Sequence, residues 1–172
     1  NPSDEEALKR IINYPARGIG QTTIDRMVVA ANQHNISMWQ VAENPDYIQD
    51  LQGRTRQSLL NFAMMIKSFA TQLAKKSAYE LAALVGKQTG LVEELYKDKT
   101  AEGVSRYENI QELLNGIKLY TENITEQEVS EDEVLPESDL AAYLQQISLL
   151  TDMDNDKDNV NRLYWSIPEH IY

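Results

Sequence analysis

One short stretch carries the residue types that can hold a phosphate group, residues 13–23 (Asn-Tyr-Pro-Ala-Arg-Gly-Ile-Gly-Gln-Thr-Thr). Its two glycines, Gly18 and Gly20, let a backbone approach a phosphate closely. A helix that begins just after them would aim unpaired N–H groups and a partial positive charge at the anion. The residues that would add positive charge or hydroxyl donors are Arg17, Thr22, Thr23 and Arg26. We therefore predict a hairpin that contacts a nucleic-acid backbone without reading its bases.

The same Gly-x-Gly spacing also fits a compact turn between two helices, in which glycine is needed for a positive φ. A second stretch, Gly53-Arg54-Thr55-Arg56, follows the same logic with more positive charge. By itself this second stretch also fits a solvated helix start. Taken together, the two glycine turns favour phosphate binding over the purely structural alternative.

Charge is divided unequally along the chain. The whole sequence carries 16 Lys and Arg against 27 Asp and Glu, a net charge of −11. Residues 1–78 hold nine of the bases and seven of the acids, a net charge of +2, so residues 79–172 hold seven bases and twenty acids, a net charge of −13. The first part can therefore face phosphate, whereas the second part would repel it.

The apolar residues predict helices around the glycine turns. Stripes at helical spacing run over residues 7–12, 24–31, 59–73, 110–119 and 140–150. Helix starts are expected as capping boxes at Ser3–Glu6, Ser77–Glu80 and Ser105–Glu108, and as an N-cap at Thr22 or Thr23. No segment shows the alternation of a strand, so we predict a compact, multi-helix, all-α fold.

We assign residues 1–157 to one helical domain and residues 158–172 to a tail whose structure the sequence does not define. Eight acids and no base fall between Glu122 and Asp139, which is typical of a solvated linker, and we place that linker at about 122–137. The chain begins with Asn1-Pro2 rather than Met, and it has no signal sequence and no apolar run of membrane-spanning length. We interpret it as a fragment of a longer protein that does not enter a membrane.

Several kinds of enzyme and metal site do not fit the sequence. It contains no phosphate-loop motif for ATP and neither the G-x-S-x-G nor the H-E-x-x-H signature. Residues 152–156 imitate the start of a calcium loop, but Lys157 and Leu163 stand where Gly and Glu are needed. His34 and His170 lack a ligand-spaced partner, and there is no cysteine. We therefore predict no catalytic residue, metal site or cofactor in this chain.

Several motifs, taken in order, resemble subdomain 2B of superfamily 1A DNA helicases of the UvrD, PcrA and Rep type. The matching stretches are residues 1–7, 12–20 with Thr23, 51–54 with Phe62, 89–91 with Tyr96, 106–114 and 140–154. They occur in the family's order and at roughly its spacing. The tail departs from the pattern, because Asn161–Tyr172 contains none of the Thr-x-His-Ser-x-Lys-Gly-Leu-Glu motif that follows in the family.

The resemblance implies an all-helical insertion in a RecA-like motor domain, one that swivels, contacts duplex DNA at a single-strand/duplex junction and regulates unwinding. It implies that ATP and Mg are bound by the parent protein's motor domains, which would be partners in cis, in the bacterial cytoplasm. The residues that match its duplex-contacting motif are Arg17, Gly18, Ile19, Gly20 and Thr23. The Gly53-Arg54 turn matches less closely.

Our full set of expected DNA-backbone contacts is Arg17, Gly18, Ile19, Gly20, Thr22, Thr23, Arg26, Gly53, Arg54, Thr55 and Arg56. We expect an accessory DNA-binding domain that alone neither hydrolyses ATP nor unwinds DNA. The alternative is a protein-interaction or autoinhibitory module that docks to helicase motor domains or to a partner protein. The acidic residues 79–172 favour this alternative.

Overall fold

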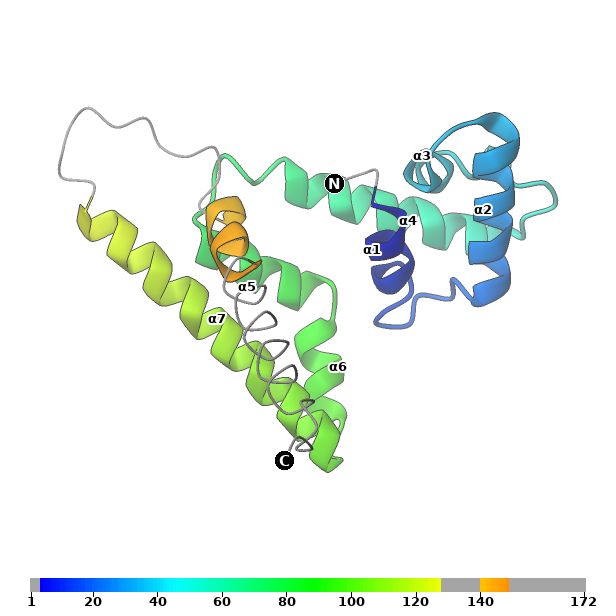
Figure 1. Cartoon of the computed structure of the whole chain (residues 1–172). Coiled ribbons are helices and arrows are strands. Elements are labelled where there is room, and N and C mark those ends of the chain that lie inside the picture. Colours follow the sequence, from blue (N-terminus) through cyan, green and yellow to red (C-terminus); the bar gives the residue numbers. More distant parts are fainter. Residues whose placement is uncertain (1–3, 128–139, 149–172) are drawn as a thin grey trace, which may run out of the picture.

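The computed structural model describes residues 4–127 and 140–148, and every regular element within them is a helix (Figure 1). The predicted all-α fold is confirmed. The elements are α1 (Glu5–Ile11), α2 (Gln21–His34), α3 (Met38–Glu43), the 3-10 turn η1 (Pro45–Tyr47), α4 (Gly53–Ala70), α5 (Ala78–Gln88), α6 (Leu91–Lys97) and α7 (Ala101–Gln127), with residues 140–148 also helical.

The first lobe of the molecule consists of α1 to α4, on the right in Figure 1. Apolar stripes of these helices meet in one core, because burial of those side chains drives the helices together. The core consists of Leu8, Ile12, Ile19, Ile24, Met27, Ala30, Ala31, Met38, Val41, Ala42, Ile48, Leu59 and Phe62. This core contains Ile12 and Ile24, which flank the 13–23 stretch, and Ile19 within it, and so it fixes the position of the stretch.

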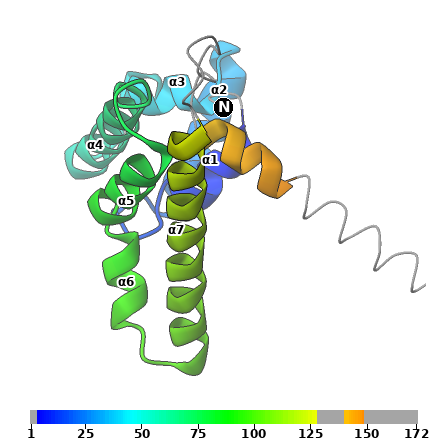
Figure 2. The ribbon, with the colours of Figure 1, turned by 90° about the vertical axis from the view of Figure 1, so that its left-hand side faces the viewer.

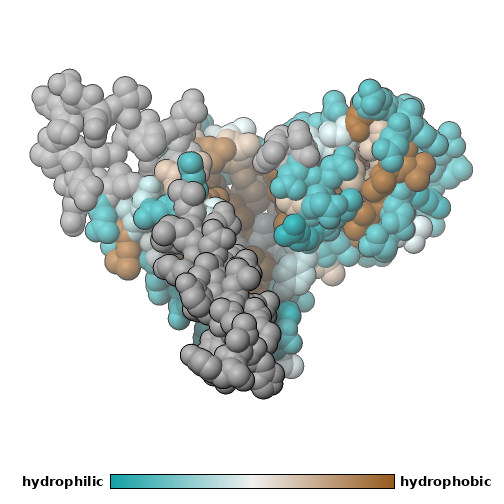
Figure 3. Space-filling view, in the orientation of Figure 1, coloured by the Kyte–Doolittle hydropathy of each residue, from teal (hydrophilic) through white to brown (hydrophobic). Residues whose placement is uncertain are grey.

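The second lobe consists of α5 to α7, where α5 and α6 both pack against the long helix α7 (Figure 2). Its buried side chains include Ala78, Leu81, Leu95 and Ile117. Helix α4 runs from the first lobe toward the second (Figure 1). Figure 3 shows an open notch between the lobes, with apolar surface visible inside it. Helix α4 is thus the covalent bridge between two separately packed helix groups.

Several expected helix starts differ from the structure. Asp4 caps α1, accepting the backbone N–H of Ala7 at 2.9 Å, and the expected cap Ser3 lies outside the described residues. The capping box at Ser77 is confirmed. The box expected at Ser105 is wrong, because Ser105 lies inside α7, which already begins at Ala101.

The segment assigned to an acidic linker is helical in its first part. Helix α7 continues to Gln127, so residues 122–127 extend the helix, and residues 128–139 lie outside the described part of the chain. The calcium-loop imitation at 152–163 and the 158–172 tail also lie outside it. Among the described helices, none is both long and apolar enough to cross a membrane.

Candidate nucleic-acid interface

The hairpin that joins α1 to α2 is anchored by two isoleucines. Ile12 and Ile19 are fully buried in the first-lobe core, so the backbone between them is held at both ends. Gly18 has a φ of +77°, a left-handed conformation that side-chain-bearing residues adopt only at a cost. The Ile19 side chain therefore packs in the core, whereas the exposed residues of the hairpin are Tyr14, Ala16, Gly18 and Gly20.

Asn13 closes this hairpin from inside. Its Oδ1 accepts the backbone N–H of Arg17 at 2.8 Å and that of Ile19 at 3.1 Å. Asparagine commonly bonds to backbone groups further along a turn, and this preference was the sequence signal available for Asn13, which our expected site omitted. Both amides are therefore engaged within the hairpin and are not open to an external anion.

The start of α2 is open to solvent. Gly20 is its N-cap, with extended backbone (φ −76°, ψ 172°) and no side-chain capping bond, so neither Thr22 nor Thr23 is the cap we expected. A Cβ added at Gly20 would meet no atom within 4 Å. Helices α1, α3 and α5, by contrast, are capped by the side chains of Asp4, Ser37 and Ser77. The uncapped first turn of α2 therefore presents backbone N–H groups to whatever approaches Gly20.

Helix α4 begins in a related way. Gly53 is its first residue, Gln52 is the N-cap, and no side chain caps the first turn. A Cβ at Gly53 would also meet no atom within 4 Å. Positive φ among the described glycines occurs at Gly18 and Gly90, so Gly53 is a helix start and not a second hairpin. Thr55 lies half-buried in this first turn.

The four arginines of the expected site differ in how far they are engaged by other groups of the protein. Arg26 and Arg54 are exposed, and within the described residues neither forms an ion pair. Arg56 is paired with Asp46. Arg17 donates hydrogen bonds to backbone carbonyls instead, and burial lowers the pKa of its guanidinium from the ordinary value. The two arginines available to phosphate are therefore Arg26 and Arg54.

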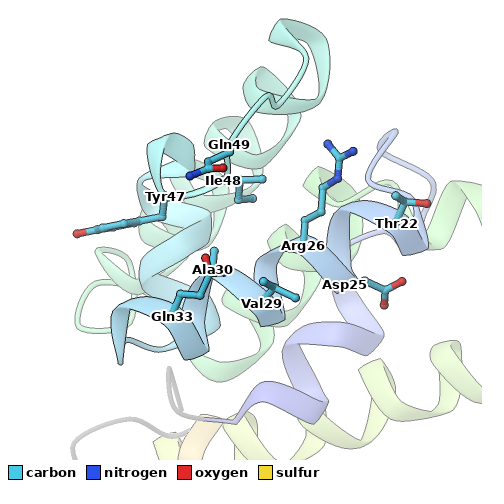
Figure 4. A pocket seen from close by; sticks show the side chains of 9 residues that line it. All are labelled: Thr22, Asp25, Arg26, Val29, Ala30, Gln33, Tyr47, Ile48 and Gln49. Carbon is cyan, nitrogen blue, oxygen red and sulfur yellow. The ribbon is translucent and has the colours of Figure 1, made fainter.

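A groove of about 310 Å³ runs between α2 and the segment 47–49. Figure 4 shows Arg26 rising from α2 between Thr22 and the wall formed by Ile48 and Gln49. The acid in the groove, Asp25, accepts a hydrogen bond from Gln21 Nε2 at 2.9 Å. The groove thus runs along α2 from Thr22 to Gln33, and its opposite wall precedes the start of α4 in the chain by four residues.

We also searched the described residues for side chains that could together bind a metal ion. No three His, Asp or Glu side chains there converge in a way that could hold a metal ion. The candidate site is instead a surface of backbone amides, hydroxyls and two free arginines, which suits an anion. Together, the fold and this surface define an all-helical domain whose candidate site is an uncapped helix start beside exposed arginines.

Comparison with known proteins gives the family. Residues 1–164 match the UvrD-like helicase C-terminal domain, and the chain belongs to this family. It is 33% identical over 154 residues to the ATP-dependent DNA helicase PcrA of Staphylococcus aureus, and 30% identical over 154 residues to PcrA of Staphylococcus epidermidis. Each alignment covers 90% of this chain and 20% of the relative. The chain thus spans about a fifth of the length of these curated relatives.

Proposed function

We propose that this chain is the 2B-type accessory subdomain of an ATP-dependent DNA helicase and that it contacts the backbone of duplex DNA near a single-strand/duplex junction. The observation that carries the proposal is the open start of α2. Gly20 has free space around its Cα, and the first turn has no side-chain cap. A helix N-terminus with unpaired N–H groups is suited to receive a phosphate oxygen.

The groove beside α2 extends this contact. Arg26 lines it, and its far wall leads to Gly53 and Arg54 at the start of α4. Amides and arginines that contact phosphates position a duplex but do not identify its bases. We therefore expect weak binding without sequence preference.

The motor belongs to other parts of the parent protein in this proposal. The family and the relatives named as ATP-dependent DNA helicases support a helicase parent. This chain has no phosphate loop, so ATP and Mg would be bound by the motor domains, which are its partners in cis in the bacterial cytoplasm. The chain alone should hold duplex without hydrolysing ATP or unwinding DNA.

The experiment is duplex affinity against salt concentration, measured by fluorescence anisotropy of a labelled duplex. Each phosphate neutralised contributes about −0.9 to the slope of log affinity against log salt. The Arg26→Ala/Arg54→Ala double variant should therefore bind more weakly and lose about 1.8 of the slope. Lys75→Ala/Lys76→Ala removes the same charge beyond the other end of α4 and should leave the slope close to that of the unmodified chain. Absence of duplex binding at low salt would overturn the proposal.

A second candidate function is docking to a protein, and a different surface favours it. Helices α5, α6 and α7 enclose a groove of about 430 Å³ that includes Tyr96, Tyr107 and Leu114, and Tyr96 is 59% exposed. An exposed aromatic groove is typical of a protein contact. If the motor domains shift the NMR signals of Tyr96 and Tyr107 while duplex shifts none near Gly18, the docking module is the better account.

A further inference from the structure

Arg17 lies where four segments of the fold meet. Its Nη1 donates to the carbonyl of Ile11 at 3.1 Å and to that of Pro15 at 3.0 Å, and its Nη2 donates to the carbonyl of Thr89 at 3.3 Å. The guanidinium carbon lies 5.7 Å from the ring centroid of the buried Phe62 on α4. One side chain thus joins the end of α1, the hairpin, α4 and the turn between α5 and α6.

Two of the three carbonyls that Arg17 binds belong to the C-terminal ends of helices. Ile11 is the last residue of α1, and Thr89 is the C-cap of α5. The last carbonyls of a helix lack partners within it and carry the negative end of the helix dipole, so a cation with several donors is well suited there. The planar fork of arginine serves two such ends at once, which a single ammonium group would do less well.

This geometry leaves few hydrogen-bond donors of Arg17 free to contact a phosphate. Three of the five guanidinium N–H groups already donate to carbonyls. The residue's own backbone N–H donates to Asn13. Arg26, in contrast, extends into its groove and forms no ion pair among the described residues.

We propose that Arg17 is a positioning residue, which holds the hairpin backbone at the angle that binds phosphate and ties it to the α5–α7 lobe through the Thr89 carbonyl. The DNA half of this inference rests on the proposed function. According to this proposal, Arg17 matters for duplex binding because of the planar shape and the N–H donors of its guanidinium, and not because of its charge. A displacement of the α5–α6 turn should therefore alter duplex binding at Gly20. Duplex binding at Gly20 should likewise alter the α5–α6 turn.

The test compares Arg17→Lys, Arg17→Ala and Arg10→Lys by duplex affinity across a salt series and by amide NMR without DNA. Arg17→Lys keeps the charge but loses the fork, and we expect about tenfold weaker binding, comparable to the loss of one charge-assisted hydrogen bond. The salt slope should be unchanged in both Arg17 variants. The amide signals of Thr89, Gly90 and Leu91 should shift in them, although these residues are distant in sequence. Arg10→Lys, on the exposed face of α1, should neither weaken duplex binding nor shift these amide signals.

Two results would overturn the inference. One is a loss of about 0.9 of the slope in Arg17→Ala with full retention in Arg17→Lys, since that is the behaviour of a phosphate contact. The other is unmoved signals at Thr89 to Leu91 in a folded Arg17→Lys protein. If the unmodified chain does not bind duplex at all, the proposed function fails and the DNA half fails with it, whereas the amide shifts still decide whether Arg17 links the two lobes.

Discussion

The side-chain oxygen of Asn13 lies 3.1 Å from the backbone nitrogen of Ile19 and accepts its hydrogen bond across the hairpin. The same oxygen accepts the amide of Arg17. Asn13 thus pairs two amides that would otherwise lie unpaired beside the buried Ile19 side chain. The shape of the hairpin depends on this uncharged side chain as much as on its glycines.

Replacement of Asn13 by alanine should therefore disturb the hairpin without changing its charge. We expect Asn13→Ala to lower the free energy of unfolding by about 1–2 kcal/mol, because two partly buried amides lose their acceptor. Duplex binding should weaken while its salt slope stays the same, since no phosphate contact is removed. Urea unfolding and anisotropy measure the two effects. Asn32→Ala, on the exposed face of α2, is the control and should change neither; equal effects in both variants would contradict the role of Asn13.

The two glycines of the hairpin should respond in opposite ways. Gly18→Ala should destabilise the fold by about 1–2 kcal/mol, because its φ of +77° is unfavourable for alanine. Gly20→Ser should raise the unfolding free energy by a few tenths of a kcal/mol, because serine caps a helix slightly better than glycine does.

Gly20→Ser should nevertheless weaken duplex binding, since its hydroxyl would occupy the N–H groups and the space that a phosphate needs. Thermal unfolding and anisotropy on the same sample check both signs. A Gly20→Ser protein that is more stable and binds duplex as well as the unmodified chain would show that phosphate does not bind at the start of α2.

Arg54 and Arg56 are a matched pair for separating phosphate contact from structure. Arg54 is exposed and forms no ion pair within the described residues, whereas Arg56 is paired with Asp46. Arg54→Ala should change stability by less than about 0.5 kcal/mol and reduce the salt slope by about 0.9. Arg56→Ala should cost up to about 1 kcal/mol of stability and change the slope less. The reverse ranking of slopes would move the phosphate contact from Arg54 to Arg56.

Asp98 makes the turn before α7 sensitive to acid. Thr100 donates to Asp98 Oδ1 from its hydroxyl at 2.7 Å and from its backbone N–H at 3.0 Å. These bonds favour the carboxylate and lower the pKa of Asp98 below its ordinary value of 3.8. The stabilisation is therefore complete above pH 3.8 and is lost as the pH falls through the lower, folded-state pKa.

Gly103→Ala should abolish this sensitivity. A Cβ there would overlap the Asp98 carboxylate, so the carboxylate must move away from Thr100 and its pKa should rise toward 3.8. An NMR titration of the Asp98 carboxyl carbon measures the change, and Asp98→Asn, which has no carboxyl to titrate, serves as the control in acid unfolding. An unaltered pKa in Gly103→Ala would mean that the turn rearranges without disturbing the bonds to Thr100.

Much of the fold follows from local sequence. The positions of Pro15, Gly18 and Gly20 between two apolar stripes predict the hairpin, and Ser77 with Glu80 predicts a capping box that the structure contains. These features could be predicted because their causes act over three to six residues. The starts of α2 and α7 differ from the predicted ones. Helix α2 follows Gly20, which has no capping side chain, and α7 begins at Ala101, where Thr100 Oγ1 accepts the backbone N–H of Gly103 at 3.0 Å.

The sequence by itself determined that the described residues are helical, that twenty of the 27 acids lie after residue 78, and that a glycine hairpin lies near the beginning of the chain. Only the tertiary structure decided which arginine is available. Arg17 and Arg26 look equivalent in a sequence, but the carbonyl that Arg17 binds at Thr89 is 72 residues away. This hydrogen bond depends on where the fold places the α5–α6 turn relative to the hairpin, because a guanidinium binds the carbonyls that the fold brings within its reach.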